Sequence, residues 1–382
     1  MKIAHISDFH ARRHVPGHPQ LLVRRSRLMP SLIDAAISKI KDHTPDILVV
    51  TGDLVDAPFY GMDDPVMIDL IRKDLQLIRD TIDKVGCPVQ YLFGNHDLPS
   101  AFEDVFPDRQ PDFTLGGYRF VTFYDEEVND NTAERLGEER ARFDGVLTDA
   151  DLTPQVHLQH YMIWPEHSKG YPPAYREASE LKKQMVESGK VLLSLSGHYH
   201  AGADATVIEG VCFATARAFC QAPHPYRIYD VSDGRVNQSE HTVDVADLGR
   251  SVFIDMGGVR QSGVESPLAQ QLLALRKAGW SLVGVASLGV SERETFERET
   301  DQVMKQLEER LCPLDSVSDR RNPGPPDEVP YQAAAGNLGI GLAESHAVVV
   351  TEAEAEAARS AGIETTLADP RQMTAALETL IS

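Results

Sequence analysis

Short apolar runs alternate with amphipathic segments along the first 200 residues. Apolar runs bounded by turn residues predict strands, and apolar positions repeating every three to four residues predict helices. We expect strands at 2–7, 46–51, 88–93, 118–124, 156–159 and 191–195. The clearest helices are expected at 31–41 and 69–84. Alternation of this kind is typical of an α/β fold.

The pattern changes near residue 230, where a polar, glycine-containing stretch runs to residue 250. Such a stretch predicts a domain boundary. Beyond it the alternation resumes, with strands at 251–255 and 281–285, helices near 268–278 and 295–311, and a proline-rich loop at 322–330. With 382 residues and 42% hydrophobic content, the chain can bury two cores. We therefore expect two domains, residues 1–245 and 250–382.

The formal net charge is −21, although charged residues make up an ordinary 25% of the chain. A surface this acidic repels nucleic-acid phosphates, so bulk DNA or RNA binding is disfavoured. The opening MKIAHISDFH reaches Asp8 without the apolar segment of a signal peptide, and no later run predicts a membrane span. Four scattered cysteines are expected to be reduced thiols. These features predict a cytoplasmic protein with no membrane partner.

Each strand of the first domain except 118–124 is followed directly by side chains that can bind metal ions. In chain order they are Asp8 and His10, Asp53, Asn95 with His96 and Asp97, His160, and His198 with His200. Any one of them alone is more often a turn, a helix cap or a core residue. The carboxyl ends of strands in open α/β sheets meet at one edge, where ligands bind. Recurrence at five strand ends therefore predicts a metal centre.

Carboxylate, amide and imidazole donors without a thiolate suit Mn²⁺, Fe, Zn²⁺ or Co²⁺ rather than a closed structural zinc site. Seven candidate ligands are too many for one ion and enough for two, if one carboxylate bridges. Two ions about 3.5–4 Å apart stabilise the attacking and leaving oxygens of an in-line phosphoryl displacement. We therefore predict a hydrolase of phosphate esters with two divalent ions, Mn²⁺ being favoured.

The ordered motifs DxH, GD, GNHD, a lone His and GHYH resemble those of the calcineurin-like metallophosphoesterases, especially their cyclic-nucleotide and glycerophosphodiester phosphodiesterases. The resemblance covers residues 1 to about 245 and implies a four-layer α-β-β-α sandwich. It implies that Asp8, His10 and His200 bind one metal and that Asn95, His160 and His198 bind the other, with Asp53 as the bridge.

The resemblance also implies a mechanism, in which a hydroxide held by both ions attacks phosphorus without a protein nucleophile. His96 would stabilise the pentavalent oxygens or protonate the leaving alkoxide, and Asp97 would orient its ring. The expected substrate is a small phosphodiester, with a cyclic nucleotide as one candidate. A nuclease is the alternative, because MKIAHISDFH is also similar to the opening of repair exonucleases. A scaffold without activity is a third reading, which the complete ligand set opposes.

Two further groups of side chains leave alternatives open. The basic residues near the first motif would either clamp a second anionic group or form a solvated face, and we favour the solvated face: Arg12, Arg13, His14, Arg24, Arg25 and Arg27. The aromatic residues after His160 would either line a pocket or pack a long loop: Trp164, Tyr171 and Tyr175.

From residue 252 the text FIDMGGVRQSG resembles the opening of haloacid-dehalogenase-type phosphatases, and VGVASLGV, DRRNPGPP and AVVVTEAEAEAARSAGI follow in that family's order. The resemblance implies a smaller, Rossmann-like α/β domain with Asp255 at the nucleophile position. The family's acid, Thr, Lys and metal-binding Asp are replaced by Gly257, by Ala286 or Ser287, by Asn322 and by Val350. Because an aspartyl-phosphate mechanism needs those groups, we expect an inactive domain. It would serve homo-oligomer formation, active-site covering or partner binding.

Overall fold

The computed structural model describes residues 1–15, 24–58, 62–128, 132–165, 173–243, 250–264, 266–278, 280–286, 302–307, 309–310, 314–319, 331–332, 334–335 and 341–381. The chain divides into two compact units. The first comprises Met1–Val15 with Leu32–Val243, and the second comprises Pro16–Ser31 with Asp244–Ser382. All the predicted metal ligands belong to the first unit.

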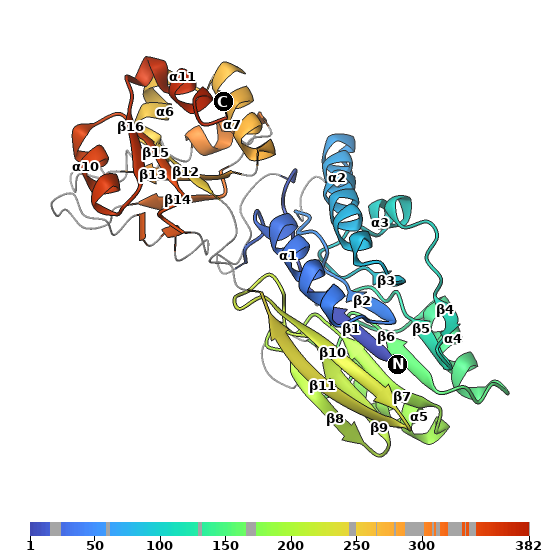
Figure 1. Ribbon diagram of the computed structural model, residues 1–382. Coiled ribbons are helices and arrows are strands. Elements are labelled where there is room, and N and C mark those ends of the chain that lie inside the picture. The colour runs from blue at the N-terminus through green and yellow to red at the C-terminus, as the bar shows by residue number, and fades with distance from the viewer. Residues whose placement is uncertain are drawn as a thin grey trace. The chain divides into compact units, whose positions relative to one another are not determined.

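The first sheet of this unit has the strand order β11-β10-β1-β2-β3. Its strands are β1 (Lys2–Ile6), β2 (Ile47–Thr51), β3 (Val89–Leu92), β10 (Pro225–Ser232) and β11 (Arg235–Thr242). The first three run parallel and are connected through α1 (Met29–Asp42) and α2 (Pro65–Ile82), as Figure 1 shows. These strands are almost wholly buried, which explains their continuous apolar sequence.

The second sheet has the order β4-β5-β6-β7-β9-β8. Its strands are β4 (Asp112–Leu115), β5 (Tyr118–Thr122), β6 (Gln155–Leu158), β7 (Val191–Ser196), β8 (Ala203–Ile208) and β9 (Val211–Thr215). Strands β5, β6, β7 and β9 are parallel, and the edge strands β4 and β8 are antiparallel to their neighbours. The associated helices are α3 (Pro99–Val105), α4 (Gly137–Thr148) and α5 (Ala178–Ser188).

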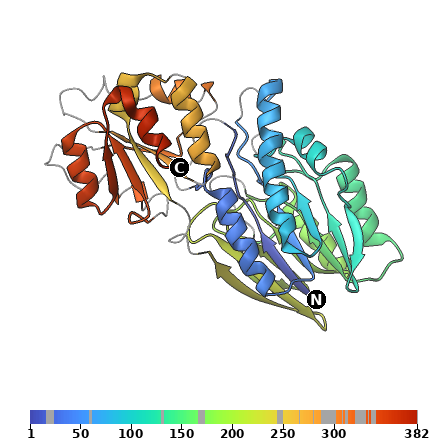
Figure 2. The same cartoon turned by 45° about the horizontal axis from the view of Figure 1, so that its top comes forward.

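The two sheets pack face to face through one apolar core, to which β2 contributes Val49 and β6 contributes Leu158. A second core joins α4 and α5 to the outer face of the second sheet through Phe143 and Leu181. Helices α1 and α2 cover the outer face of the first sheet (Figure 2). The predicted four-layer α-β-β-α fold is thus confirmed.

The second unit contains a parallel sheet of order β14-β13-β12-β15-β16. Its strands are β12 (Ser251–Asp255), β13 (Ser281–Ala286), β14 (Ser316–Asp319), β15 (His346–Val349) and β16 (Glu364–Leu367). Its longer helices are α6 (Met256–Ser262), α7 (Ser266–Lys277), α10 (Glu352–Ser360) and α11 (Met373–Glu378). The central strand lies first in sequence, as in Rossmann-like folds, so this part of the predicted fold class is also confirmed.

The polar stretch at residues 230–250, in which the sequence analysis placed the domain boundary, contains regular structure in its first half. Residues up to 242 form the hairpin of β10 and β11, which extends the first sheet beyond β1. Because β11 is an edge strand and mostly exposed, its sequence is largely polar, and the apolar alternation by which a strand is recognised is missing. Within the predicted helix at 295–311, the structure describes helix at 302–307, and the predicted loop at 322–330 lies outside the described residues.

Among the described residues, no helix combines the length and the apolar character needed to cross a lipid bilayer. The described cysteines Cys87, Cys212 and Cys220 form no disulfide. Cys312 lies outside the described residues.

A buried cation joins the aromatic residues of the second sheet. The guanidinium of Arg135 donates to Asp125 Oδ2 at 2.8 Å and to the Tyr175 hydroxyl at 2.9 Å, and it lies 3.7 Å from the centroid of the Phe123 ring. Tyr175 is therefore a packing residue, as one of the two alternatives predicted. Trp164 packs beneath Lys182 Nζ, and Tyr171 lies outside the described residues.

Replacing Arg135 with Met should destabilise the first unit by about 3–5 kcal/mol, because Asp125 would be left as an unpaired buried charge. Urea unfolding in a Trp280→Phe background measures this, since Trp164 is then the only tryptophan. The control is Arg140→Met, which removes more exposed ion pairs with Asp144 and Glu180 and should cost about 1 kcal/mol or less. Equal losses in the two variants would show that the buried pair has no special weight.

Candidate metal centre

The predicted ligands follow five strands, and the fold brings all of them to one edge of the sandwich. Asp8 and His10 follow β1, Asp53 follows β2, and Asn95 follows β3, all in the first sheet. His160 follows β6, and His198 and His200 follow β7, in the second sheet. The two sheets are joined at this edge, because His198 N–H donates to Asp8 Oδ1 at 3.1 Å and His160 Nδ1 lies 2.7 Å from the Thr51 carbonyl oxygen. The carboxyl ends of both sheets therefore form one site.

Four of the predicted ligands adopt backbone conformations that residues other than glycine rarely take. Asp8, His10, Asp53 and His198 have φ values of 57°, 46°, 52° and 63°. Such conformations cost about 1–3 kcal/mol each and persist where the surrounding structure enforces them, most often at functional sites. The loops are therefore held in conformations that their own residues do not favour.

The glycines of the GNHD and GHYH motifs allow the close approach of these loops. A Cβ atom on Gly94 would overlap Asp53 Oδ1 and lie 2.6 Å from Asp53 N. A Cβ atom on Gly197 would overlap Ser7 Oγ and lie 2.7 Å from Asp8 Oδ2. Both glycines thus leave room for carboxylates of the site, which explains why glycine precedes the ligand in each motif.

The first group of donor atoms comprises Asp8, His10, Asp53 and His200. His10 Nε2 lies 3.1 Å from His200 Nε2 and 3.3 Å from Asp53 Oδ2. His200 Nε2 lies 3.8 Å from Asp8 Oδ1.

The second group comprises Asp53, His160 and His198, with the amide of Asn95 beside them. His160 Nε2 lies 3.2 Å from His198 Nδ1, 3.2 Å from Asn95 Oδ1 and 3.4 Å from Asp53 Oδ1. Asp53 thus belongs to both groups, through different carboxylate oxygens.

These separations fit a cation between the donors. Ligand atoms about 2.1 Å from an ion lie about 3.0 Å apart in an octahedron and about 3.4 Å apart in a tetrahedron. The tautomer of His160 agrees, because its Nδ1 is 2.7 Å from the Thr51 carbonyl, which can only accept a hydrogen bond. When this ring is neutral, as in a metal complex, its proton is therefore on Nδ1 and the Nε2 lone pair points at the cluster. Asp8, His10, Asp53, Asn95, His160, His198 and His200 are suited to hold divalent metal ions.

The charges of the cluster are strongly coupled. Burial would raise the pKa of Asp53, but the imidazoles of His160, His10 and His96 outweigh this and hold it well below its usual range. Burial lowers the pKa of His160, yet the Asp53 carboxylate outweighs it and raises the pKa to about 9. Burial and the charge of His160 lower the pKa of His198 to about 3. A neutral His198 next to an ionised Asp53 offers lone pairs to a cation.

His96 lies beside the cluster, but its partner is not the predicted one. Its Nδ1 is 2.8 Å from Asp56 Oδ1, and Asp56 Oδ2 accepts a hydrogen bond from Arg12 Nε at 2.8 Å. Burial would raise the pKa of Asp56, but hydrogen bonds from His10 and His96 and the Arg12 charge hold it well below its usual range. Asp56 is therefore the ionised group that orients His96.

Asp97, the predicted orienting group, instead supports the loops. Its oxygens accept hydrogen bonds from the backbone N–H groups of Leu54, Val55 and Gly94 at 2.9–3.1 Å. Burial and the neighbouring Asp53 charge raise the pKa of Asp97 to about 7, although these hydrogen bonds oppose the rise. Asp97 thus fixes the loops after β2 and β3 relative to each other.

The favoured interpretation of the basic residues, a solvated face, is wrong for three of them. Arg12, Arg24 and Arg27 are at most 9% exposed. His14 Nδ1 binds Asp74 Oδ1 at 2.7 Å, and this carboxylate also accepts the backbone N–H of Arg13. The arginine nearest the site is Arg12, which forms an ion pair with Asp56 and so helps to hold the carboxylate that contacts His96.

The sequence argument missed Asp56, Cys220 and Gln221. Asp56 carries a local signal, because it stands three residues after Asp53 in GDLVD, within the same loop. Cys220 and Gln221 follow β9, a strand that the sequence analysis did not predict and whose end lies at the same edge. Gln221 Nε2 lies 2.7 Å from His200 Nδ1, and rotation of the amide would let its oxygen accept a proton from that ring.

Replacing Gly197 with Ala should lower metal content strongly, because the new methyl group would displace the Asp8 carboxylate or the segment that holds His198. Elemental analysis of purified protein after metal loading measures this loss. Gly145→Ala is the matched control, since a Cβ at this position on α4 meets nothing within 4 Å. Full metal content in both variants would contradict the proposed packing.

Metal binding should release protons, because the raised pKa of His160, about 9, keeps its ring protonated at neutral pH until a cation displaces the proton. Below pH 9 the apparent affinity should therefore rise about tenfold per pH unit for each proton displaced. Calorimetric titration in buffers of different ionisation enthalpy counts the protons. Binding that releases none between pH 6.5 and 8 would exclude this protonation state.

Comparison with known proteins identifies the family. Residues 1–202 match the calcineurin-like phosphoesterase family. A protein of Synechococcus sp. named as a probable cyclic nucleotide phosphodiesterase is 24% identical over 255 residues, which cover 64% of this chain and 93% of the relative.

Solved structures show weaker likeness. A dimetal phosphatase from Danio rerio is 15% identical, with a TM-score of 0.46 over 63% of this chain and 98% of its own. The protein TT1561 of Thermus thermophilus is 13% identical, with a TM-score of 0.43 over 62% of this chain and 97% of its own. A D,D-heptose 1,7-bisphosphate phosphatase from B. bronchiseptica is 20% identical, with a TM-score of 0.28 over 33% of this chain and 86% of its own. The assignment rests on the family match, which spans more than half of the 382 residues. The chain belongs to the calcineurin-like phosphoesterase family and is a metal-dependent hydrolase of phosphate esters.

Proposed function

We propose that the protein hydrolyses a small phosphodiester with a pair of divalent ions bridged by Asp53. The observation that carries this proposal is the position of the Asp53 carboxylate, whose two oxygens face different groups of donors. Asp8, His10 and His200 would hold one ion, and Asn95, His160 and His198 the other. When bound, such a pair supplies an activated water and neutralises charge on the phosphoryl oxygens.

The roles of the protein groups follow from their contacts. His96 is partly exposed at the edge of the cluster, and its side chain is 11% accessible. Asp56 accepts the Nδ1 proton of His96 and leaves Nε2 to face the substrate, where it can donate to a phosphoryl or leaving oxygen. Arg12 holds Asp56 in turn. Asp56 and Arg12 are therefore positioning residues, and His96 is the proposed catalytic residue.

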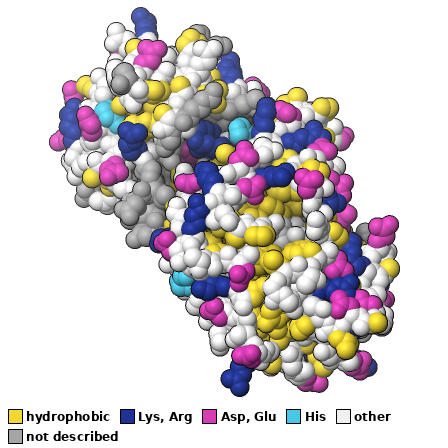
Figure 3. Space-filling view, turned by 45° about the vertical axis from the view of Figure 1, so that its right-hand side comes forward, with side chains coloured by type: hydrophobic (Ala, Val, Ile, Leu, Met, Phe, Trp, Pro, Cys, Tyr) yellow, Lys and Arg dark blue, Asp and Glu magenta, His cyan; other side chains and the backbone are white. Residues whose placement is uncertain are grey.

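A small substrate fits the charge of the protein better than a nucleic acid does. The net charge is −21, and on the face seen in Figure 3 Lys and Arg side chains are scattered among Asp and Glu. A continuous basic strip would be needed to bind a long phosphate backbone. The name of the Synechococcus relative supports a cyclic nucleotide as the first candidate. The nuclease remains the second candidate function.

For the second unit we propose a role without catalysis. Asp255, at the position of the haloacid-dehalogenase nucleophile, accepts backbone N–H groups with both oxygens. Oδ1 lies 2.7 Å from Gly257 N, and Oδ2 lies 3.1 Å from Val350 N. These contacts make Asp255 the N-cap of α6, which is a structural role.

Hydrolysis of bis(p-nitrophenyl) phosphate, with Mn²⁺ and with a chelator, tests the proposed activity. Cyclic nucleotides and single-stranded DNA, assayed in parallel, separate a small-molecule phosphodiesterase from a nuclease. We expect metal-dependent turnover of the small diesters and little of DNA. Absence of turnover with every divalent ion would favour the scaffold.

His96→Ala should lower kcat by about 10²–10⁴, because a positioned acid or hydrogen-bond donor is lost. Both ions should remain bound, which elemental analysis checks. Asp56→Asn should also lower kcat and shift the pH dependence of kcat, because an amide no longer stabilises the charged ring. Unchanged turnover in His96→Ala would remove this residue from the mechanism.

A further inference from the structure

A buried thiol lies next to the first group of metal donors. Cys220 is 0% exposed and stands five residues beyond the end of β9. Its backbone N–H donates to the Asp8 carbonyl at 3.0 Å, and that of Phe219 donates to the Ser7 carbonyl at 2.9 Å. The segment that carries the thiol is thus fixed to the exit of β1, the same segment that carries two predicted ligands.

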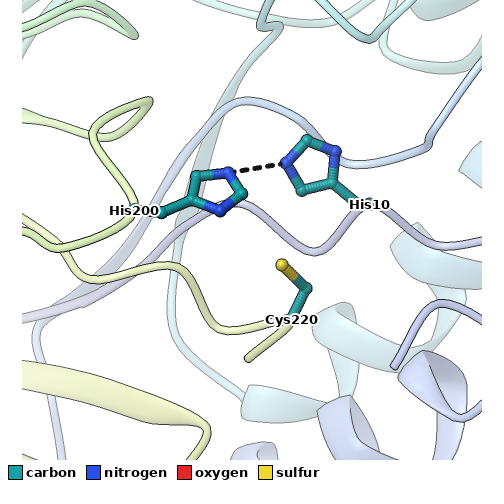
Figure 4. Close-up of side chains that lie close together, drawn as sticks. All are labelled: His10, His200 and Cys220. Atoms are coloured by element: carbon teal, nitrogen blue, oxygen red, sulfur yellow. Dashed lines mark hydrogen bonds between the residues drawn. The ribbon is translucent and has the colours of Figure 1, made fainter. Parts of the chain in front are cut away.

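The thiol and two imidazoles form a cluster with the geometry of a metal site. Ligand atoms of Cys220, His10 and His200 lie within 4.8 Å of one another. In Figure 4 the sulfur points towards the two rings, which face each other. The rings are 3.1 Å apart at their Nε2 atoms, and Gln221 contacts the other nitrogen of His200. Three elements distant in sequence therefore direct one sulfur and two nitrogens at the same space.

We propose that Cys220 Sγ is a further ligand of the ion held by His10 and His200, and that this position prefers Zn²⁺, Co²⁺ or Fe²⁺ to Mn²⁺. Thiolate is a soft donor that selects these ions, whereas carboxylate and carbonyl oxygens suit Mn²⁺. On binding, the thiol gives its proton to solvent and the sulfur takes its place at the ion.

The inference rests on the proposed metal pair, and it implies that the two metal positions differ in their donor atoms. The group formed by Asn95, His160 and His198 has no sulfur among the described cysteines near it, since Cys220 joins only the cluster of His10 and His200. The second position therefore offers nitrogen and oxygen donors alone and accepts a harder ion. A mixed pair of ions is the expected loaded state.

Titration of the chelator-treated full-length protein with Co²⁺ tests this directly. A thiolate bound to Co²⁺ gives a near-ultraviolet charge-transfer band, while the visible ligand-field bands report bound cobalt whatever the donor. We expect the charge-transfer band in the unmodified protein, its loss in Cys220→Ser and its retention in Cys212→Ser. Cys212 is a buried thiol on β9 outside the cluster, so it is the matched control.

The outcomes separate the two claims. Bound cobalt without the charge-transfer band, or a band that survives in Cys220→Ser, would overturn the role of Cys220 and leave the metal pair intact. Failure to bind cobalt at all would overturn both. In competition, Cys220→Ser should lower the preference for Zn²⁺ over Mn²⁺ by at least about tenfold.

A second measurement needs no variant. The zinc X-ray absorption spectrum of the loaded protein should show a sulfur scatterer at about 2.3 Å. A first shell of nitrogen and oxygen alone would contradict the proposal, even if Cys220→Ser failed to fold.

Discussion

The structure of the first unit is organised around buried donor atoms that face one another. The carboxylate of Asp53 is 1% exposed and has imidazole nitrogens within 3.4 Å on both sides. The lone pairs of these oxygen and nitrogen atoms repel one another. Bound protons relieve only part of this repulsion, because each proton is bound to one atom at a time. Divalent cations satisfy several lone pairs at once. The four-layer fold provides the rigid edge on which this arrangement is held.

The cost of the arrangement is visible in the loops. The backbone conformations of four candidate ligands are ones that residues with a side chain rarely adopt: Asp8, His10, Asp53 and His198. The loops also approach so closely that positions 94 and 197 must be glycine. Asp97 stabilises them by accepting three backbone N–H groups. These loops combine unfavourable backbone conformations with hydrogen bonds that hold them in place. The geometry of the site, rather than the conformational preference of each residue, therefore determines the path of the chain.

The convergence of the candidate ligands could be predicted from the sequence, because parallel strands end at a common edge, so that the residues following each strand meet. The α/β class followed from the alternation of predicted strands and helices, and the four-layer arrangement followed from the family resemblance. The sequence could not show that Asp56 rather than Asp97 orients His96. Both carboxylates closely follow a candidate ligand, and only the path of the loop decides which of them reaches His96. The burial of Arg12 and the approach of Cys220 depend on long-range packing that no local pattern encodes. The edge strand β11 was hidden because most of its residues are exposed and polar, so that its sequence shows no clear apolar alternation.

The central claim is that one carboxylate joins two ions. A crystal grown with Mn²⁺ and Zn²⁺, examined by anomalous scattering at both absorption edges, tests it most directly. The account predicts two peaks about 3.5–4 Å apart with Asp53 between them. A single peak, or ions bound without contact to Asp53, would contradict it.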